Sequence, residues 1–397
     1  MIAVAAVRTA IVVGAGIGGL TTAVGLRRAG VDTVVLERRS APGRLLTGGG
    51  FMLWHNALLA LRELKLDERV AEAGVEIVYH EFRSDRGRRL ARWDIAPEAE
   101  RYGAPALGLR RSALNTVLME AAGDDVRLGR RCVGFEQDDD GVTARLADGS
   151  ELRADVLIGA DGIRSTVRDV LRKGHDLPLR YAGYTAWQAI TRLPGEDAVP
   201  TGTFFNLWGR GGLRFLYMRL NPEEVYWDAI TADSVGASFD MLAKDRREVL
   251  AETYRDWPDP VPGIVASTEE EAILPIDIFD RPPDRSAGWG RGRVVLLGDA
   301  AHPMTLNLSQ GAGQAIEDGV ALSRLLSEHD RVPEAVAAFE ELRRARVDGM
   351  TGTAWSIGAM GRWRSRALCI GRDLFMRAFF DGKGRRESYA QMMDVRF

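Results

Sequence analysis

A glycine-rich turn near the amino terminus most constrains what this chain can fold into. The run Gly14-Ala15-Gly16-Ile17-Gly18-Gly19 has the spacing G-x-G-x-x-G and follows a short apolar, β-branched run at residues 9–13. After the turn, the pattern is typical of a helix from about Gly18 to Ala29, and then of a strand over residues 33–36 that ends at Glu37. This succession of strand, turn, helix and strand predicts a right-handed βαβ crossover.

The turn and the acid after the second strand together predict a dinucleotide site. Gly14, Gly16 and Gly19 permit the tight turn, the approach of the backbone to a pyrophosphate and close helix packing. Glu37 can accept hydrogen bonds from ribose hydroxyls, which fits FAD or NAD, although Arg38 beside it keeps that choice open. A tight turn with a purely structural role is the alternative.

Two later segments predict further strands of the same sheet. Residues 156–159 form an apolar run that ends in Ala160-Asp161-Gly162, and residues 293–298 form another that ends in Asp299. Both place an aspartate just past the carboxyl end of a strand, where open α/β sheets bind ligands. Aromatic-rich runs between them predict a second, mostly antiparallel sheet at residues 181–192, 203–208, 213–220 and 225–230. Helical periodicity follows at residues 311–326, 334–346 and 353–380.

Composition and charge exclude several classes of protein. Lys and Arg number 53 against 56 Asp and Glu, a near balance that does not favour nucleic acid as a partner. The two cysteines and five histidines have neither disulfide nor metal-ligand spacing, so we expect no metal and a reducing, cytoplasmic location. The glycine-dense residues 9–26 do not fit a leader, and no run reaches the roughly 20 apolar residues that span a bilayer, so we expect no membrane partner.

Three signatures in order give the chain a family resemblance. They are the glycine turn, the segment Gly159-Ala-Asp-Gly-Ile-Arg-Ser-Thr-Val-Arg168, and Gly298-Asp299 with its downstream Gly311-Ala312-Gly313. Over nearly its whole length the chain resembles the FAD-dependent class A monooxygenases, which include aromatic hydroxylases, urate hydroxylases and zeaxanthin epoxidase-like enzymes.

The expected fold class is α/β, with a Rossmann-like FAD-binding domain assembled from separated segments. We expect residues 8–75, 101–176 and 275–345 in that domain, residues 76–100 and 177–274 in the inserted substrate sheet, and residues 346–397 in a C-terminal helical region. The tail after Thr351 would cover the pocket or support a dimer, so a monomer and a homodimer both stay open.

The resemblance implies roles for residues around the flavin. Asp299 matches the residue that holds the ribityl chain, and Gly311, Ala312 and Gly313 match backbone beside the isoalloxazine. A helix that starts near Gly313 would direct N–H donors and its positive end toward flavin N1 and O2, where reduced flavin carries negative charge. The alternative is an ordinary loop before a helix.

Further cofactor contacts follow from the same resemblance. Arg111 matches an arginine near the FAD phosphates and ribityl chain, Arg44 is a weaker candidate, and ordinary exposed arginines are the alternative. Asp161 matches a residue that serves the flavin, or else caps the next helix. The backbone at Val133 would contact adenine.

The reaction implied by the resemblance needs FAD, NADH or NADPH, O2 and a small-molecule substrate. FAD reduced by the nicotinamide would react with oxygen to a C4a-hydroperoxide, which transfers one oxygen atom to the substrate in a hydroxylation or epoxidation. No second glycine motif has strand and helix context, so the nicotinamide would bind without a Rossmann domain of its own. The sequence does not distinguish NADH from NADPH.

Candidates for the substrate pocket come from the inserted sheet. On one face of residues 213–220 lie Leu213, Phe215 and Tyr217, and Tyr217 is the candidate that would hydrogen-bond a substrate oxygen. Aromatic walls would come from Phe205, Trp208, Tyr226 and Trp227, although packing of the sheet on its helices is the alternative for most of them. This nearly uncharged face favours a large, neutral aromatic or polycyclic substrate, whereas Arg214 would overturn that inference if the opposite face meets the flavin.

Departures from the family pattern motivate competing functions. Where relatives commonly read Pro-x-x-Gly-Gln-Gly, this chain has Leu306-Asn-Leu-Ser309-Gln-Gly311, so Ser309 would crowd or hydrogen-bond the peroxide position. His55 stands where proline is usual. These changes leave open a flavin oxidase or dehydrogenase without productive oxygen transfer. A flavoprotein that sequesters a hydrophobic small molecule without turnover is also open.

Overall fold

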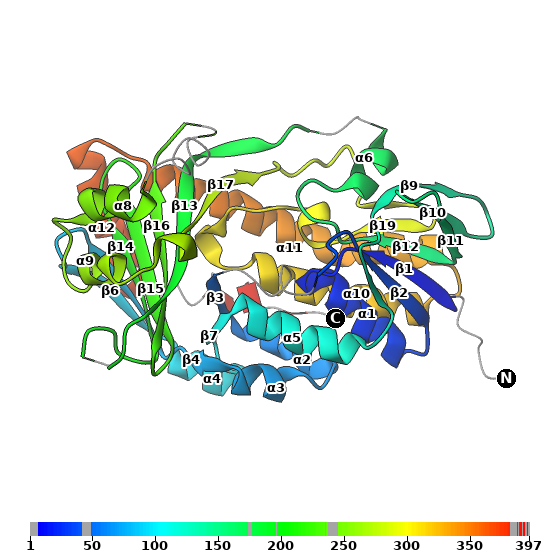
Figure 1. Cartoon of the computed structure of the whole chain (residues 1–397), viewed down its shortest axis with the longest axis horizontal. Coiled ribbons are helices and arrows are strands. Elements are labelled where there is room, and N and C mark those ends of the chain that lie inside the picture. The colour runs from blue at the N-terminus through cyan, green and yellow to red at the C-terminus, as the bar shows by residue number, and fades with distance from the viewer. Residues whose placement is uncertain are drawn as a thin grey trace.

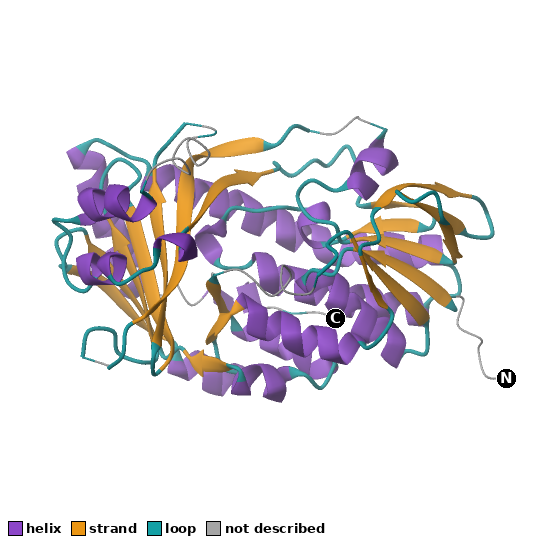
Figure 2. Ribbon diagram, in the orientation of Figure 1, coloured by secondary structure: helices purple, strands orange, loops and turns teal. Residues whose placement is uncertain are grey.

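Two large β-sheets lie near opposite ends of the molecule, and long helices run between them (Figure 1). Figure 2 shows the same separation, with strands at both ends and helices across the middle. The computed structural model describes residues 7–41, 49–173, 177–195, 197–234, 236, 245–381, 387, 389–390, 392–393 and 395. Within them the architecture is mixed α/β, as expected from the sequence.

The first sheet has six strands and contains the glycine turn. In spatial order its strands are β18 (Gly290–Arg291), β19 (Val294–Leu296), β12 (Val156–Gly159), β1 (Thr9–Val13), β2 (Asp32–Glu37) and β8 (Val126–Leu128). All neighbours pair in parallel except β18 with β19. Helix α1 (Ile17–Arg28) connects β1 to β2 and packs against α10 (Gly311–Glu328) and α5 (Arg111–Ala122). The βαβ unit and the two returning strands are therefore present.

The second sheet has seven strands and is mostly antiparallel, as predicted. In order these are β17 (Leu274–Asp280), β13 (Arg180–Arg192), β16 (Glu224–Thr231), β15 (Arg214–Asn221), β14 (Thr203–Trp208), β5 (Tyr79–Ser84) and β6 (Arg89–Asp94). Only β14 and β5 pair in parallel. Strand β17 belongs to this sheet because it pairs with β13, whereas the sequence analysis placed residues 275–345 with the FAD-binding segments.

Smaller elements complete the two halves. Two three-stranded sheets consist of β3 (Gly50–Leu53), β7 (Leu107–Arg110) and β4 (Gly74–Glu76), and of β11 (Glu151–Ala154), β10 (Val142–Leu146) and β9 (Cys132–Gln137). The remaining α-helices are α2 (His55–Glu63), α3 (Asp67–Glu72), α4 (Ala96–Tyr102), α6 (Thr166–Arg172), α8 (Arg246–Tyr254), α9 (Val261–Ala266), α11 (Val332–Gly361) and α12 (Arg366–Asp381). Short 3-10 turns are η2 (Glu270–Ala272), η3 (Gly298–Ala300) and η4 (Leu306–Leu308).

Helix α11 is longer than the sequence predicts. The expected helix over 334–346 and the start of the expected amphipathic region at 353 are parts of one helix of 30 residues, which also crosses the expected domain boundary at 345/346. Gly349 and Gly352 within it suggest a break, because each glycine costs a helix interior about 1 kcal/mol. The buried side chains of Val347, Met350 and Ala354 continue on the same helix face, so packing outweighs that cost.

Candidate active site

The glycine turn is fixed by two close backbone approaches. Gly14 has φ +110°, and a methyl group there would lie 2.4 Å from the carbonyl oxygen of Ala160 in the loop after β12. A methyl group on Gly19 would lie 2.0 Å from the carbonyl oxygen of Gly14. Both glycines are therefore required for packing the turn against its neighbours.

Gly16 has a different environment. It is the N-cap residue of α1, and a methyl group there would meet no atom within 4 Å. Gly162 and Gly311 also face open space, in the loop after β12 and at the start of α10. The three signatures thus each present backbone that a ligand can approach, and at Gly16 this backbone begins a helix whose positive end suits a pyrophosphate. The arrangement fits FAD.

Glu37 supports the turn as well as offering an acceptor. Its buried carboxylate accepts hydrogen bonds from the N–H groups of Ala15 at 3.0 Å and Arg39 at 2.9 Å. Each carboxylate oxygen can accept more than one hydrogen bond, so a ribose hydroxyl can bind without breaking these contacts. The neighbour that pairs with Glu37 is Arg39, at 3.6 Å, while Arg38 is exposed.

Asp299 follows β19 in the turn η3. The residue is exposed to solvent, yet burial of its carboxyl group among protein atoms raises its pKa, while the charges of His302 and Arg111 act in the opposite direction. The Asp299 side chain thus has charged protein groups near it while solvent still reaches the residue. Arg111, at the start of α5, is exposed near it, and its N–H donates to Gly49 at 3.0 Å. Arg44 lies outside the described residues.

Asp161 has the capping geometry that the sequence left as its alternative. Its carboxylate accepts hydrogen bonds from the N–H groups of Thr166 at 2.7 Å and Val167 at 3.2 Å, and from the hydroxyl of Ser165. Asp161 therefore stabilises the amino-terminal end of α6 through these hydrogen bonds. Val133 lies on β9 with its side chain exposed.

The three residues expected beside the flavin have different surroundings at the start of α10. The helix begins at Gly311, where the helical pattern of the sequence begins and two residues before the start near Gly313 that the resemblance implied. Gly311 faces open space, whereas a methyl group on Gly313 would lie 3.2 Å from Nδ2 of Asn56 and 3.6 Å from Cβ of Ala57 on α2. Gly311 is thus the accessible position, Gly313 is a packing position, and half-buried Ala312 lies between them.

Ser309 occupies a backbone conformation that favours glycine. Its φ is +52°, and its N–H donates to the carbonyl of Leu306 at 3.0 Å to close the turn η4. A non-glycine residue in this left-handed region costs about 1–2 kcal/mol. The serine that departs from the family pattern therefore also carries backbone strain.

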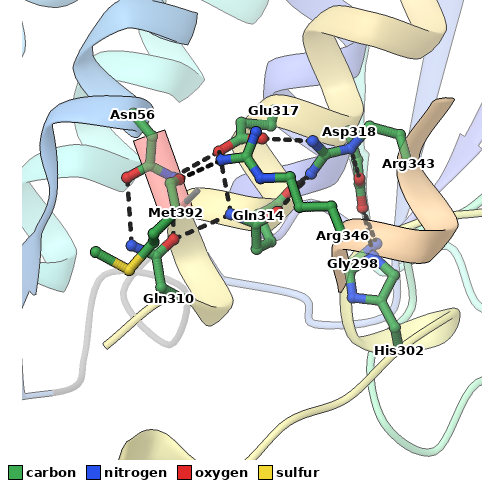
Figure 3. A network of polar contacts seen from close by, with 10 residues as sticks. All are labelled: Asn56, Gly298, His302, Gln310, Gln314, Glu317, Asp318, Arg343, Arg346 and Met392. Carbon is green, nitrogen blue, oxygen red and sulfur yellow. Dashed lines mark hydrogen bonds and ion pairs between the residues drawn. The ribbon is translucent and has the colours of Figure 1, made fainter. Parts of the chain in front are cut away.

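A buried ionic network connects the turn after β19 with α10 and α11 (Figure 3). Asp318 of α10 accepts hydrogen bonds from the N–H of Gly298 at 2.9 Å, Nε2 of His302 at 2.6 Å and Nε of Arg343 at 2.8 Å. Burial would raise the pKa of the Asp318 carboxyl, but the charges of His302 and Arg343 outweigh it and hold that pKa well below its usual value. The turn that carries Asp299 is thereby tied to α10 and α11.

The second half of the network centres on Glu317. One carboxylate oxygen pairs with Arg343, and the other accepts from Asn56 at 2.5 Å, Gln314 at 3.0 Å and Arg346 at 3.0 Å. Sequence reasoning missed this network. The available signal was the adjacent pair Glu317-Asp318 within an otherwise apolar helix pattern, since buried acids require partners.

Most of the residues predicted for the substrate pocket lie on the face of the seven-stranded sheet that packs against α8 and α9. The predicted residues Phe205, Phe215, Tyr217 and Trp227 pack in one cluster with Leu250, Tyr254, Val261 and Ile264 of α8 and α9. Figure 1 shows these two helices on the side of the sheet away from α10. Leu213 lies in a surface groove with Val249 and Arg364. The period of two defines two faces, but it does not say which one meets the flavin.

The opposite face contacts the loop before α10. Arg214 donates from Nη1 to Oδ1 of Asn307 in η4 at 2.6 Å, so the sheet is directly linked to the segment that contains Ser309. Two predicted pocket residues, Trp208 and Tyr226, lie on this face, and Tyr226 donates its hydroxyl hydrogen to Oδ2 of Asp228 at 2.6 Å. Burial raises the pKa of Asp228 to about 6.

His55, the third departure from the family pattern, is a buried structural residue. Its Nδ1 donates to the carbonyl of Ala104 at 2.6 Å, and its ring stacks on Tyr102 at 6.2 Å between centroids. Burial lowers the pKa of this imidazole to about 4, so it is neutral at pH 7.

The described part of the chain contains neither a cluster of metal ligands nor a helix that could span a membrane. No group of three or more His, Cys, Asp or Glu side chains there is arranged to hold a metal ion. None of the described helices combines the length and apolar character needed to cross a bilayer.

Comparison with known proteins supports the same interpretation. Residues 7–184 and 262–354 match the family model of an FAD binding domain. The aurachin C monooxygenase/isomerase of Stigmatella aurantiaca is 38% identical over 370 residues, which cover 93% of this chain and 94% of that protein. The FAD-dependent urate hydroxylase of Mycolicibacterium vanbaalenii is 32% identical, with 85% of this chain and 84% of that protein covered. Klebsiella pneumoniae HpxO complexed with FAD and uric acid has a TM-score of 0.87 at 28% identity, with 98% of this chain and 96% of that chain covered.

The two kinds of glycine in the turn predict different mutant behaviour. Gly19→Ala forces a methyl group against backbone, so we expect the apoprotein to lose at least about 3 kcal/mol of unfolding free energy. Gly16→Ala meets open space and should change apoprotein stability by less than about 1 kcal/mol, while flavin retention falls. Thermal unfolding of apoprotein and flavin content after gel filtration check both. Full flavin retention by folded Gly16→Ala would contradict the site.

Relief of strain at position 309 is a second expectation. Ser309→Gly should raise the unfolding free energy by about 0.5–1 kcal/mol, because the gain at positive φ exceeds the greater entropy of the unfolded chain. Ser309→Ala keeps the strain and serves as the control. Chemical denaturation of the three proteins measures the difference, and an equal gain in the alanine variant would show that the hydroxyl, not the backbone, is responsible.

Proposed function

The chain belongs to the class A FAD-dependent monooxygenases, and on that premise we propose that it hydroxylates or epoxidises an aromatic or polycyclic substrate. Bound FAD would take electrons from NADH or NADPH and use them with O2 to supply one oxygen atom to that substrate. The protein would orient the substrate and exclude water from the reacting atoms.

Residues from all three signatures are proposed to hold the cofactor. The backbone at Gly16 would bind the pyrophosphate, and Glu37 would bind a ribose. Asp299 and Arg111 would bind the ribityl and phosphate region. The backbone at Val133 would contact adenine, and Gly311 would lie beside the isoalloxazine. Apart from the buried Glu37, whose carboxylate oxygens can accept further hydrogen bonds, each of these groups is exposed or faces open space, which supports the assignment.

One observation carries the proposed substrate site. On the face of the seven-stranded sheet that contacts η4, five residues carry buried polar atoms without a hydrogen-bond partner among the described residues. They are His80 with both ring nitrogens, Asn206 Oδ1, Trp208 Nε1, Arg214 Nε and Asp228 Oδ1. The Asp228 carboxyl also has a side-chain hydrogen bond with Gln188. A buried polar atom without a partner costs about 1–3 kcal/mol, so a ligand that pairs with these atoms would be stabilised on this face.

The other face of the same sheet provides an internal comparison. There the indole N–H of Trp187 donates to Thr231 at 2.9 Å, and that of Trp227 donates to Thr268 at 3.0 Å. The hydroxyl of Tyr254 is likewise paired, at 2.8 Å from the carbonyl of Ile230. The contrast indicates that the face with unpaired atoms is the binding face.

The chemistry of that face indicates a planar substrate with polar ring substituents. His80 lies between Phe82 and Phe204, at 4.1 and 4.8 Å between ring centroids, so aromatic surface surrounds the unpaired nitrogens. Burial, and next the charge of Arg214, lowers the pKa of His80 to about 3, which leaves the ring neutral. Arg214 would donate to a substrate oxygen, and Asp228 would accept a substrate N–H or O–H.

The decisive experiment is anaerobic reduction of the FAD-loaded protein by NADH and NADPH, with and without a panel of aromatic compounds, followed by oxygen. We expect reduction that substrate accelerates and product that contains one oxygen atom from O2. Oxygen consumption that yields only hydrogen peroxide would favour an oxidase, an alternative motivated by Leu306 in η4 and by Ser309 directly after it. No reduction by either nucleotide would favour a sequestering flavoprotein.

A matched pair of variants tests which face binds. Asp228→Asn and Tyr217→Phe remove one polar function each, from opposite faces of the sheet. We expect Asp228→Asn to raise KM about 10- to 100-fold, because a hydrogen bond to a charged group is worth about 1.5–3 kcal/mol. Tyr217→Phe should leave KM unchanged. The reverse result would return the substrate to the face first predicted from the sequence.

Asp228 also predicts a pH dependence of stability. Its pKa of about 6 in the folded protein exceeds the usual 3.8, so ionisation destabilises the fold. That penalty is complete above pH 6 and disappears as the pH falls toward 4. We expect apoprotein to gain about 2–3 kcal/mol between pH 7 and pH 4 relative to Asp228→Asn. Unfolding free energies across this range measure it, and parallel curves would contradict the shifted pKa.

A further inference from the structure

Helix α12 exposes a cluster of large apolar side chains. Leu368, Ile370, Leu374 and Phe375 are 50%, 51%, 59% and 58% exposed, and Trp363 just before the helix is 37% exposed. Single exposed apolar residues are common on protein surfaces, but a contiguous group marks an interaction site. We call these five side chains the α12 patch.

The opposite side of α12 is already packed against the protein. Met376 is buried with Trp208, and Phe380 stacks on Phe82 at 4.3 Å between ring centroids. The buried guanidinium of Arg372 donates to the carbonyl of Gly209 at 2.8 Å. Because these contacts hold the helix on the sheet, the α12 patch is an additional surface and not a core face that lacks its partner.

The charges of this segment are mostly positive. Arg362, Arg364, Arg366 and Arg377 are exposed, whereas residues 362–381 contain two acids, Asp373 and Asp381 at the end of α12. Asp373 is engaged by Arg372 at 2.9 Å and by Arg88 at 3.9 Å, so it does not balance the exposed arginines. The partner of this surface therefore has to be both apolar and anionic.

That charge pattern decides between two occupants. In a symmetric dimer the same patch meets itself, which would bring arginines against arginines. An anionic lipid surface complements both the apolar side chains and the arginines. The apolar side chains can contact the acyl chains, and the guanidinium groups can pair with the anionic headgroups. With 16 residues, α12 is too short to span a bilayer but can lie along its surface.

We propose that the α12 patch docks the protein on an anionic lipid surface. The helix lies in the plane of the interface, with Leu374 and Phe375 in the acyl boundary and the arginines among the headgroups. This departs from the expectation, drawn from the sequence, that the protein has no membrane partner. That expectation rested on the absence of a spanning segment, which does not exclude a helix that lies on the surface.

Flotation of FAD-loaded protein with vesicles tests the proposal. We expect binding to vesicles of phosphatidylcholine with phosphatidylglycerol, little binding to phosphatidylcholine alone, and weaker binding as salt is raised. Leu374→Ser with Phe375→Ser should reduce binding at least tenfold. The matched control is Leu274→Ser with Ile276→Ser on β17, which removes two side chains exposed at 40% and 41% and should leave binding unchanged.

Flavin content and thermal unfolding establish that each variant is folded before its binding is compared. Equal flotation with and without phosphatidylglycerol, or unchanged binding in the α12 variant, overturns the proposal. Light scattering measures the oligomeric state of the wild-type protein and of the α12 variant. A wild-type dimer that becomes a monomer in the α12 variant would overturn the proposal and assign the patch to a second copy of the chain.

Discussion

The buried guanidinium of Arg343 is the constraint on which the flavin side of the molecule depends. It pairs with Glu317 and Asp318 on α10, and through Asp318 it holds the backbone of Gly298 and the ring of His302. Losing one partner of such a buried group costs about 3–5 kcal/mol, because the remaining charge is left without compensation. The turn that carries Asp299 and the start of α10 are therefore positioned by one ionic centre.

The sequence was most informative where the determinants are local. The spacing of Gly14, Gly16 and Gly19 predicted the strand, turn and helix, since Gly14 and Gly19 lie against backbone a few residues away or at a neighbouring strand end and Gly16 caps the helix. Asp161 and Ser165 likewise cap the helix that directly follows them. Family resemblance extended this to the order of the three signatures and to the cofactor.

Contacts between residues far apart in the chain could not be predicted from the sequence. Alternation along β15 distinguished Tyr217 from Arg214, but only the placement of α8 and α9 shows that Tyr217 is covered and Arg214 contacts Asn307. The positive φ of Ser309 depends on how η4 closes before α10, which no local pattern of that segment reveals. The network of Glu317 and Arg343 joins side chains 26 residues apart on two helices.

The two faces of the seven-stranded sheet also respond differently to evolutionary change. Phe205, Phe215 and Trp227 fill a closed cluster, so replacements there are limited by volume. Asn206, Leu216 and Asp228 alternate with them on the same strands and lie on the face that we propose binds the substrate. We expect substrate range to diversify among descendants at every second residue of these strands, while the intervening residues drift slowly. One sheet can thus preserve its stability while it acquires new chemistry.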